Sequence, residues 1–198
     1  MSGEDDLRFA CKCGAVTGHI ENASPKIGDH LVCHCTDCQR FAQLCGAEER
    51  VLDQHAGTAL FQSRCAAVKV DKGREELACL HLTEMPTLRW YARCCKTPMF
   101  NTYKNGRLPY VSTILGNTPA DARRAQIGAP VGHLHVDEGR GSVGDVPRMS
   151  MPALIFGAAK RIAKDTLTGK RRQAALFDAE TLFPIAEPER ISPERQRL

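Results

Sequence analysis

The chain has 198 residues, which is enough for one domain of ordinary size with an appendage and a buried core. Apolar residues make up 42% and charged residues 25% of the sequence, and this balance excludes wholesale disorder. The net charge of +4 is small and both signs are scattered along the chain, so we expect neither nucleic-acid nor membrane partners.

The first six residues are acidic and polar, and they lack the basic start and apolar run of a secretory signal. No stretch approaches the roughly 20 apolar residues that span a bilayer. We therefore expect a cytoplasmic protein. Ten cysteines are many for a reducing compartment, where clustered thiols bind metal or do redox chemistry more often than they form disulfides.

The first cysteine pair lies in residues 7–20, where apolar and polar residues alternate around Cys11-Lys12-Cys13-Gly14. This pattern predicts a strand with a tight turn, in which Gly14 allows the sharp backbone path. Residues 22–29 have the composition of a loop. Residues 37–44 then predict a short helix that ends at Gly46, which puts the second cysteine group on a bend between a strand and a helix.

The middle of the chain has the pattern of β-strands in residues 59–61, 66–70, 77–82, 88–92 and 110–115. The run Asp71-Lys72-Gly73-Arg74 predicts a hairpin turn between two of these strands. Apolar residues at two-residue spacing predict a further strand in residues 131–136, within a Gly-rich stretch. We therefore expect a mainly β core with its cysteine clusters at loops and turns.

The sequence changes character after Pro147. Residues 151–170 contain helix formers with apolar residues on roughly one face: Leu154, Ile155, Ala158, Ala159 and Ile162. Beyond residue 177, three prolines favour an extended tail. We expect a cysteine-rich β domain in residues 1–147, and a helix and extended tail packed on it in residues 148–198.

The most specific motif is the run of Cys33, Cys35 and Cys38. Zinc binds thiolates in a tetrahedron, and ligands two or three positions apart on a turn can point at one ion. The run therefore predicts zinc with three protein ligands. The fourth ligand stays open: His34 points away if the segment is extended, Cys45 could close the site if the chain folds back, and otherwise water or a substrate thiol completes it.

The charge of this predicted zinc site constrains its chemistry. Three thiolates give a net negative centre, which is a weaker Lewis acid toward water than a three-histidine site. Such a centre suits the uptake of a thiol, because coordination lowers the pKa of the thiol. We therefore expect a small-molecule thiol as substrate and Cys33, Cys35 and Cys38 as the catalytic metal site.

A second zinc site is predicted from Cys11 and Cys13 together with Cys94 and Cys95. A metal held by these residues would stabilise the fold by closing a long loop. Consecutive side chains of an extended strand point to opposite faces, so Cys95 is favoured over Cys94 as a ligand. A vicinal disulfide or one free core thiol are the alternatives.

The remaining candidate residues have simpler interpretations. Cys45, Cys65 and Cys79 stand alone in apolar company and are expected in the core, as are Trp90 and Tyr91. His133 and His135 would face the same side of a strand, but no thiol or carboxylate near them in sequence completes a metal site. Three arginines flank the clusters and either steady an anionic substrate or are solvated: Arg40, Arg89 and Arg93.

Three motifs in this order resemble the glutathione-dependent formaldehyde-activating enzymes: Cys11-Lys12-Cys13-Gly14, Cys33-His34-Cys35-x-x-Cys38-Gln39-Arg40 and Cys95-Lys96-Thr97-Pro98-Met99. The resemblance covers residues 7–115. The segment from Arg89 to Cys95, with Asn101-Thr102, is similar to a bacterial branch of that superfamily without a settled activity. The superfamily also includes centromere protein V.

The resemblance implies an Mss4-like fold of two packed sheets with zinc at the strand ends. It implies a reactive zinc at Cys33, Cys35 and Cys38, and a structural zinc at Cys11, Cys13 and Cys95. The implied reaction is that of a carbon-sulfur lyase of the S-(hydroxymethyl)glutathione synthase type, which forms an adduct between glutathione and formaldehyde.

Two departures from the family pattern bear on these expectations. The family usually has Cys-x-x-Cys-Gly where this chain has Ala92 in the first position and Lys96 in the last, so Cys94 is a candidate for the lost ligand. The predicted C-terminal helix lies outside the shared core, so a pocket beneath it need not accept glutathione. The alternative to a lyase acting on a thiol and a small aldehyde is a non-catalytic binding module stabilised by two structural zinc ions.

Overall fold

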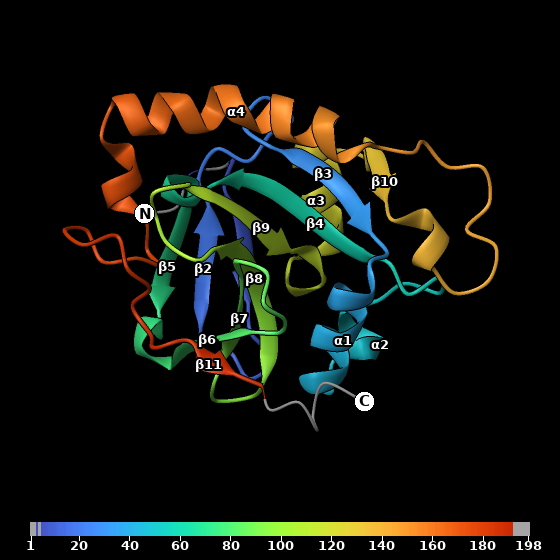
Figure 1. Cartoon of the computed structure of the whole chain (residues 1–198), viewed down its shortest axis with the longest axis horizontal. Helices are drawn as coiled ribbons and strands as arrows, with labels where there is room; N and C mark the ends of the chain where they lie inside the picture. The colour runs from blue at the N-terminus through green and yellow to red at the C-terminus, as the bar shows by residue number, and fades with distance from the viewer. Residues whose placement is uncertain (1–2, 4, 192–198) are drawn as a thin grey trace.

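The computed structural model describes residues 3 and 5–191 of the chain. It is mainly β, with two sheets and a few helices, which confirms the mainly β class expected from the sequence. Figure 1 shows the larger sheet at the centre, with α4 along the top of the molecule and α1 at one end of the sheet. Among the described residues, no helix is long and apolar enough to cross a membrane.

The smaller sheet has three strands in the order β1-β2-β5, namely β1 (Leu7–Ala10), β2 (Thr17–Ile20) and β5 (Val68–Lys72). β1 and β2 pair antiparallel across the turn that carries Cys11 and Cys13. Gly14 in this turn has a φ of 75°, a backbone conformation that favours glycine. The strand and tight turn predicted in residues 7–20 are therefore confirmed, as two strands of one hairpin.

The larger sheet has eight strands in the order β10-β3-β4-β9-β8-β7-β6-β11. They are β3 (Asp29–Cys33), β4 (Thr58–Arg64), β6 (Leu77–His81), β7 (Thr87–Ala92), β8 (Thr97–Tyr103), β9 (Tyr110–Ile114), β10 (Gly132–Leu134) and β11 (Glu189–Arg190). The six central strands pair antiparallel, and the two edge strands, β10 and β11, pair parallel to their neighbours.

The helices are α1 (Thr36–Leu44), α2 (Glu48–Val51), α3 (Ala120–Ile127) and α4 (Met151–Leu167). The helices predicted after the second cysteine group and after Pro147 are both present. Short 3-10 turns occur at Cys65–Ala67, Arg74–Glu76, Leu115–Asn117, Val136–Glu138 and Lys170–Gln173. In α4 the Ser150 hydroxyl accepts a hydrogen bond from the Ala153 amide, which caps the start of the helix.

The hairpin predicted at Asp71-Lys72-Gly73-Arg74 is wrong. The chain does turn there, with Gly73 in the left-handed region, but β5 belongs to the smaller sheet and β6 to the larger one. The turn therefore carries the chain from one sheet to the other. A turn signal specifies only that the chain reverses, whereas pairing depends on which strands share a buried face.

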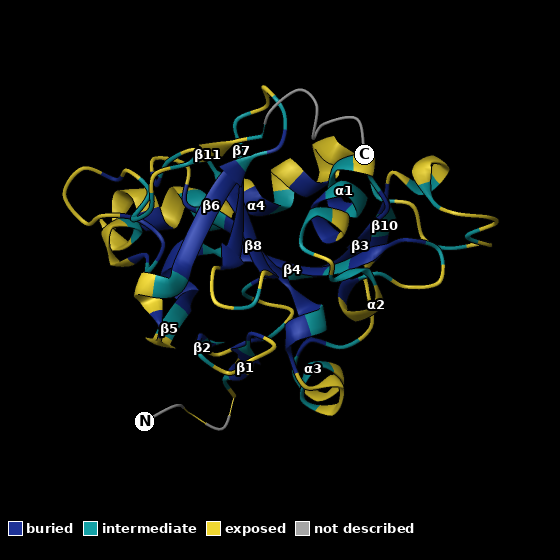
Figure 2. Ribbon diagram, turned by 90° about the horizontal axis from the view of Figure 1, so that it is seen from below, coloured by how far each residue is buried: buried dark blue, intermediate teal, exposed yellow. Residues whose placement is uncertain are grey.

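Each face of the larger sheet packs into a buried cluster of its own. Figure 2 shows that the central strands of this sheet are mostly buried. On one face Phe61, Trp90 and Phe100 pack with residues of the smaller sheet, and the Phe9 and Phe100 rings meet edge to face at 5.2 Å. On the other face Leu60 and Tyr91 pack with α1 and α4. Trp90 and its neighbour Tyr91 are both buried, as expected of core aromatics.

The chain after α4 returns to the body of the protein. Leu176 and Phe177 are buried in the cluster between the two sheets, and the Phe177 ring meets the Trp90 ring edge to face at 6.0 Å. β11 then pairs with β6 at the edge of the larger sheet. The boundary at residues 147 and 148 stays a prediction, and residues from both sides of it contribute to one core.

Candidate metal centres

The first cysteine group forms where β3 runs into α1. Cys33 is the last residue of β3, Cys35 is the residue before α1, and Cys38 is in the first turn of that helix. The amide of Cys38 donates to the carbonyl of Cys35 at 3.0 Å, which closes this bend. All three Sγ atoms lie within 4.8 Å of one another, so the group could hold a metal ion.

Neither of the two residues considered as a fourth ligand, His34 and Cys45, lies in this group. The His34 side chain is buried, and its ring nitrogens lie 3.3 Å from the His55 carbonyl and 3.1 Å from Nδ1 of His133. The His34 side chain therefore contacts partners other than the thiols, as expected for the residue between Cys33 and Cys35. Cys45, at the end of α1, is half-buried and also stays outside the group.

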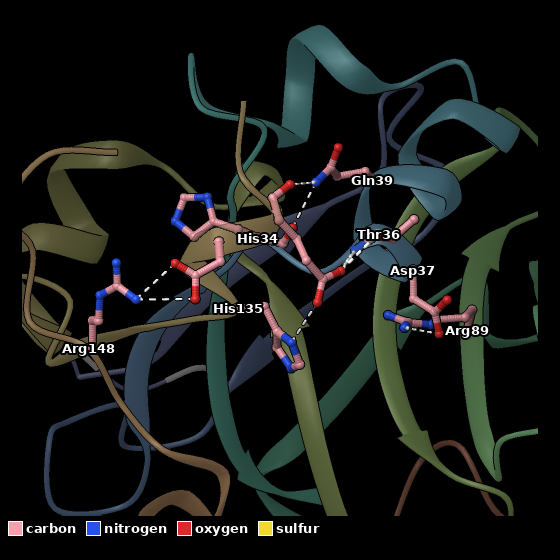
Figure 3. Close-up of polar contacts among 9 residues, drawn as sticks. His34, Thr36, Asp37, Gln39, Arg89, His135 and Arg148 are labelled. Atoms are coloured by element: carbon pink, nitrogen blue, oxygen red, sulfur yellow. Dashed lines mark hydrogen bonds and ion pairs between the residues drawn. The ribbon is translucent and has the colours of Figure 1, made fainter. Parts of the chain in front are cut away.

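Arg89 of β7 reaches the same group from across the sheet. Its Nη2 donates to Oδ2 of Asp37 at 3.5 Å (Figure 3). Its Nη1 donates to Sγ of Cys38 at 3.4 Å, and the residue is only 6% exposed. Burial alone would lower the pKa of Arg89, but the thiols of Cys38 and Cys35 and the Asp37 carboxylate raise it above its ordinary value. The guanidinium is therefore a fixed positive charge beside the sulfurs.

The three thiols of the group do not share protons equally. Contacts with Cys33 and Cys35, and then the charge of Arg89, hold the pKa of Cys38 well below its ordinary value despite its burial. Contacts with the other two thiols and burial raise the pKa of Cys33. Cys38 is therefore the first thiol of the group to become a thiolate, which is the form that binds metal.

The bend is also tied to the loop after β10. The Glu138 carboxylate accepts hydrogen bonds from the amide and hydroxyl of Thr36, both at 2.7 Å, at the start of α1. Gln39 donates to the carbonyls of His34 and Glu138 at 2.7 and 2.9 Å (Figure 3). These contacts fix the direction in which α1 leaves the strand, and hence the position of Cys38.

A cavity of about 630 Å³ opens onto the three thiols, between the larger sheet and α4. Alternate residues of the sheet strands line it, as expected where one face of each strand looks into a cavity. They are Leu31, Cys33, Leu60, Gln62, Thr87, Arg89, Asn101, Tyr103, Tyr110 and Ser112. Residues of α4 form the opposite wall: Met151, Leu154, Ile155, Ala158, Ala159, Ile162 and Ala163. The volume is in the range of small-molecule sites.

The second cysteine group brings the hairpin of the smaller sheet to the turn between β7 and β8. Sγ of Cys13 lies 3.6 Å from Cys11 and 3.3 Å from Cys94, and Sγ of Cys94 lies 3.9 Å from Cys11 and 3.8 Å from Cys95. All four sulfurs lie within 4.8 Å of one another. The group therefore has the four thiols that a closed tetrahedral site requires.

The argument that favoured Cys95 over Cys94 does not hold, because these residues are in a tight turn and not in an extended strand. The turn connects β7 to β8, and Lys96 within it has a φ of 56°. The alternation of extended side chains does not apply there, so both sulfurs face the hairpin.

Thr97 supports this second group. The amide of Lys12 donates to the Thr97 hydroxyl at 2.9 Å, and this hydroxyl lies 3.0 Å from Sγ of Cys95. Burial alone would raise the pKa of Cys95, but its hydrogen bonds with Thr97 and with Cys13 lower it to about 6. The Val16 amide similarly donates to Sγ of Cys11 at 3.2 Å. Such donors stabilise thiolates.

The other predicted candidates fall outside both groups. Cys65 and Cys79 are buried in the core, as expected, and neither Arg40 nor Arg93 lines the cavity. His133 stacks on His34, with ring centroids 5.4 Å apart, whereas the His135 ring contacts Glu138 at 2.8 Å and also lines the cavity. Of the three flanking arginines, Arg89 is the one that contacts a thiol.

Sequence reasoning missed the polar floor of the cavity and the role of Thr97. Gln62, Asn101 and Ser112 lie in the middle of buried strands, where apolar residues are the norm. Polar residues at such positions could have indicated from the sequence that these strands face a cavity. The contact of Thr97 with Lys12 joins residues far apart in the sequence and carried no local signal.

The fold and the site define a mainly β protein with two cysteine groups that could hold metal ions. The chain belongs to the family of unknown function DUF6151, whose model matches residues 4–189. This match extends through α4 and the segment that leads to β11. The sequence of the chain has no significant match among curated proteins.

A comparison with solved structures found a crystal structure of a Rhodobacter sphaeroides protein from a structural genomics project. It is 17% identical and covers 58% of this chain and 89% of its own, with a TM-score of 0.41. A likeness of this size carries no conclusion about function.

Proposed function

We propose that the protein is a zinc-dependent carbon-sulfur lyase that activates a small thiol at Cys33, Cys35 and Cys38 for addition to an aldehyde. The observation that carries this proposal is the difference between the two cysteine groups. One has four thiols, whereas the other has three and opens onto the cavity beneath α4. In zinc proteins, closed four-ligand sites are structural and sites with three protein ligands are catalytic.

The donor set fits zinc at both groups, because soft thiolates select zinc over hard cations. A zinc ion held by Cys33, Cys35 and Cys38 would lower the pKa of an incoming thiol. Arg89 offsets part of the negative charge of the three sulfurs, which favours the arrival of a further anionic sulfur. α4 shields the thiols from solvent on one side, and shielding strengthens these charge interactions.

In the proposed reaction the thiolate sulfur forms a bond to the carbonyl carbon of the aldehyde. The carbonyl π electrons move to oxygen, which takes one proton, and the product is a hemithioacetal. The reverse reaction breaks the same carbon-sulfur bond, and neither direction needs an oxidant or reductant. The order of the three cysteine motifs, with the two sheets, supports a relationship to the glutathione-dependent formaldehyde-activating enzymes and their Mss4-like fold.

The test begins with metal stoichiometry. We expect two zinc ions per chain in the wild type, one in Cys33→Ser and one in Cys11→Ser, with Cys45→Ser as a matched control that keeps both. Cobalt(II)-loaded wild type is then titrated with small thiols, and the sulfur-to-cobalt absorption is followed. The absorption should change in the wild type and in Cys45→Ser, but not in Cys33→Ser.

The competing function is a binding module in which both metal ions are structural. A saturated shell of four protein ligands at both metals in X-ray absorption, together with a cobalt spectrum that no thiol alters, would establish that alternative. NMR exchange spectroscopy measures the rate at which formaldehyde and a thiol form the hemithioacetal. A rate that the protein increases distinguishes catalysis from simple thiol binding.

A further inference from the structure

The floor of the cavity is a row of polar residues that crosses four neighbouring strands. Gln62 of β4 pairs with Ser112 of β9, and Ser112 pairs with Asn101 of β8. Asn101 in turn pairs with Arg89 of β7, whose guanidinium contacts Cys38. Residues opposite one another on adjacent strands point to the same face, so this row leads along the cavity floor to the thiols.

Most of this polar row is uncharged. Oε1 of Gln62 and Oδ1 of Asn101 are buried and have no hydrogen-bond partner among the described residues. The two amides therefore have hydrogen-bonding capacity that the protein itself does not use. Neutral amides and a hydroxyl are suited to amide or hydroxyl groups of a ligand.

The charges at the cavity do not match those of glutathione, which carries two carboxylates and an ammonium group. Among the described residues that line the cavity there is no Lys, Asp or Glu, and the one arginine, Arg89, contacts Cys38 and Asp37 through its two Nη atoms. Only its buried Nε is left without a partner among the described residues, which is a single donor for the two carboxylates of glutathione. His135 also contacts an acid outside the cavity, Glu138. Bound glutathione would therefore leave charged groups unpaired next to an apolar wall, which is costly.

The wall opposite the polar row is apolar, and so is its rim. The α4 side chains that line the cavity are all aliphatic or methionine, and Leu134 and Leu108 extend this surface. Two of these α4 residues, Met151 and Ile155, are 45% and 62% exposed. Exposed apolar residues that continue into an apolar cavity are typical of the entrance for an apolar ligand.

We propose that the thiol substrate of this site is an uncharged molecule with an apolar chain, which lies along α4 with its sulfur at Cys33, Cys35 and Cys38. This inference rests on the function proposed above and narrows its substrate class. Hydrogen-bonding groups of the substrate, such as an amide or hydroxyl, face Gln62, Ser112 and Asn101.

The test uses full-length, cobalt(II)-loaded protein titrated with 1-hexanethiol, 2-mercaptoethanol and glutathione, with the sulfur-to-cobalt absorption as the readout. Each methylene that is buried against α4 should tighten binding about fourfold. We therefore expect hexanethiol to half-saturate the protein at a concentration at least about tenfold below those of the other two thiols.

Two neighbouring residues of α4 provide matched variants. Ile155 and Phe156 are both exposed, at 62% and 71%, but only Ile155 lines the cavity. Ile155→Glu should weaken hexanethiol binding about tenfold and leave that of 2-mercaptoethanol within about twofold, because the shorter thiol has fewer methylenes to bury against α4. Phe156→Glu should change neither. The response to 2-mercaptoethanol also reports that the fold and the metal are intact.

The outcomes separate this inference from the function on which it rests. If glutathione binds as tightly as hexanethiol, or if Ile155→Glu behaves like Phe156→Glu, the apolar substrate is wrong while thiol activation stands. If none of the three thiols changes the cobalt spectrum, the proposed function is itself wrong, and this inference falls with it.

Discussion

The guanidinium of Arg89 lies 3.4 Å from the sulfur of Cys38, although the two residues are on different elements and 51 positions apart. It joins a strand in the middle of the larger sheet to the first turn of α1. A buried arginine beside three thiols is a permanent positive charge in a group that otherwise gains negative charge as it loses protons. This contact therefore links the polar floor of the cavity to the first cysteine group.

Replacing Arg89 should impair thiol uptake more than metal binding. In Arg89→Met we expect the metal ion at Cys33, Cys35 and Cys38 to remain bound. The affinity of the cobalt(II) protein for 2-mercaptoethanol should fall about tenfold, because a fourth sulfur then adds to a negative charge that no guanidinium offsets. Arg89→Lys should lie between wild type and Arg89→Met, since lysine keeps the charge but cannot reach Cys38 and Asp37 in the same fork-like geometry. Unchanged thiol affinity in Arg89→Met would show that the guanidinium has only a structural role.

The four-thiol centre should hold the fold together. Cys13 is exposed, so Cys13→Ser alters little packing, yet we expect it to lose one metal ion and to melt about 10 °C below the wild type, which corresponds to several kcal/mol. Thermal unfolding with metal analysis measures both effects. Cys45→Ser is the control, since Cys45 belongs to neither centre. Equal melting temperatures for the two variants would contradict a structural role for this centre.

Two ion pairs fasten α4 to the sheet, and they should differ in strength. Arg64 of β4 pairs with Asp165, whose side chain is fully buried, whereas Arg161 pairs with Asp29, whose side chain is 24% exposed. Arg64→Met leaves a buried carboxylate unpaired and should cost about 3 to 5 kcal/mol. Arg161→Met should cost roughly 1 kcal/mol or less.

Chemical denaturation measures these costs, and hydrogen exchange of α4 amides shows whether the helix opens first. Faster exchange confined to α4 in Arg64→Met is the expected pattern. Equal effects of the two substitutions would mean that the depth of burial does not decide the strength of these ion pairs.

The stability of the protein should fall as the pH decreases below about 6.5. Burial lowers the pKa of His30, and burial with the neighbouring His34 lowers that of His133, relative to about 6.5 for an unfolded histidine. Below that pH the unfolded chain binds protons that the folded protein does not, so unfolding becomes easier as the pH falls toward the lowered values. One such histidine contributes at most about 1.4 kcal/mol per pH unit.

Urea unfolding at several pH values between 7.5 and 5 tests this dependence. His30→Gln should reduce the slope of the unfolding free energy against pH, because glutamine does not titrate. Metal release also depends on pH, but wild type and variant have the same cysteines, so the difference between their slopes isolates the histidine. An identical slope in His30→Gln would contradict the prediction.

Much of the first cysteine group was visible in the sequence, because short-range spacing sets local geometry. Cys33, Cys35 and Cys38 lie within six residues on one bend, so their spacing already indicates that the three thiols lie close together. The mainly β class and the helices of residues 37–44 and 151–170 also followed from local patterns. The order of the motifs predicted that Cys11 and Cys13 would meet the later cysteines.

Contacts between distant segments were decided by the tertiary structure. Sheet assignment separated β5 from β6, and a turn in place of an extended strand directed Cys94 and Cys95 toward the same hairpin. Strand register aligned Gln62, Ser112, Asn101 and Arg89 in one row, and α4 closed the cavity above them. A thiol cluster within six residues depends mainly on local backbone geometry, whereas a row across four strands depends on pairings that local sequence does not encode.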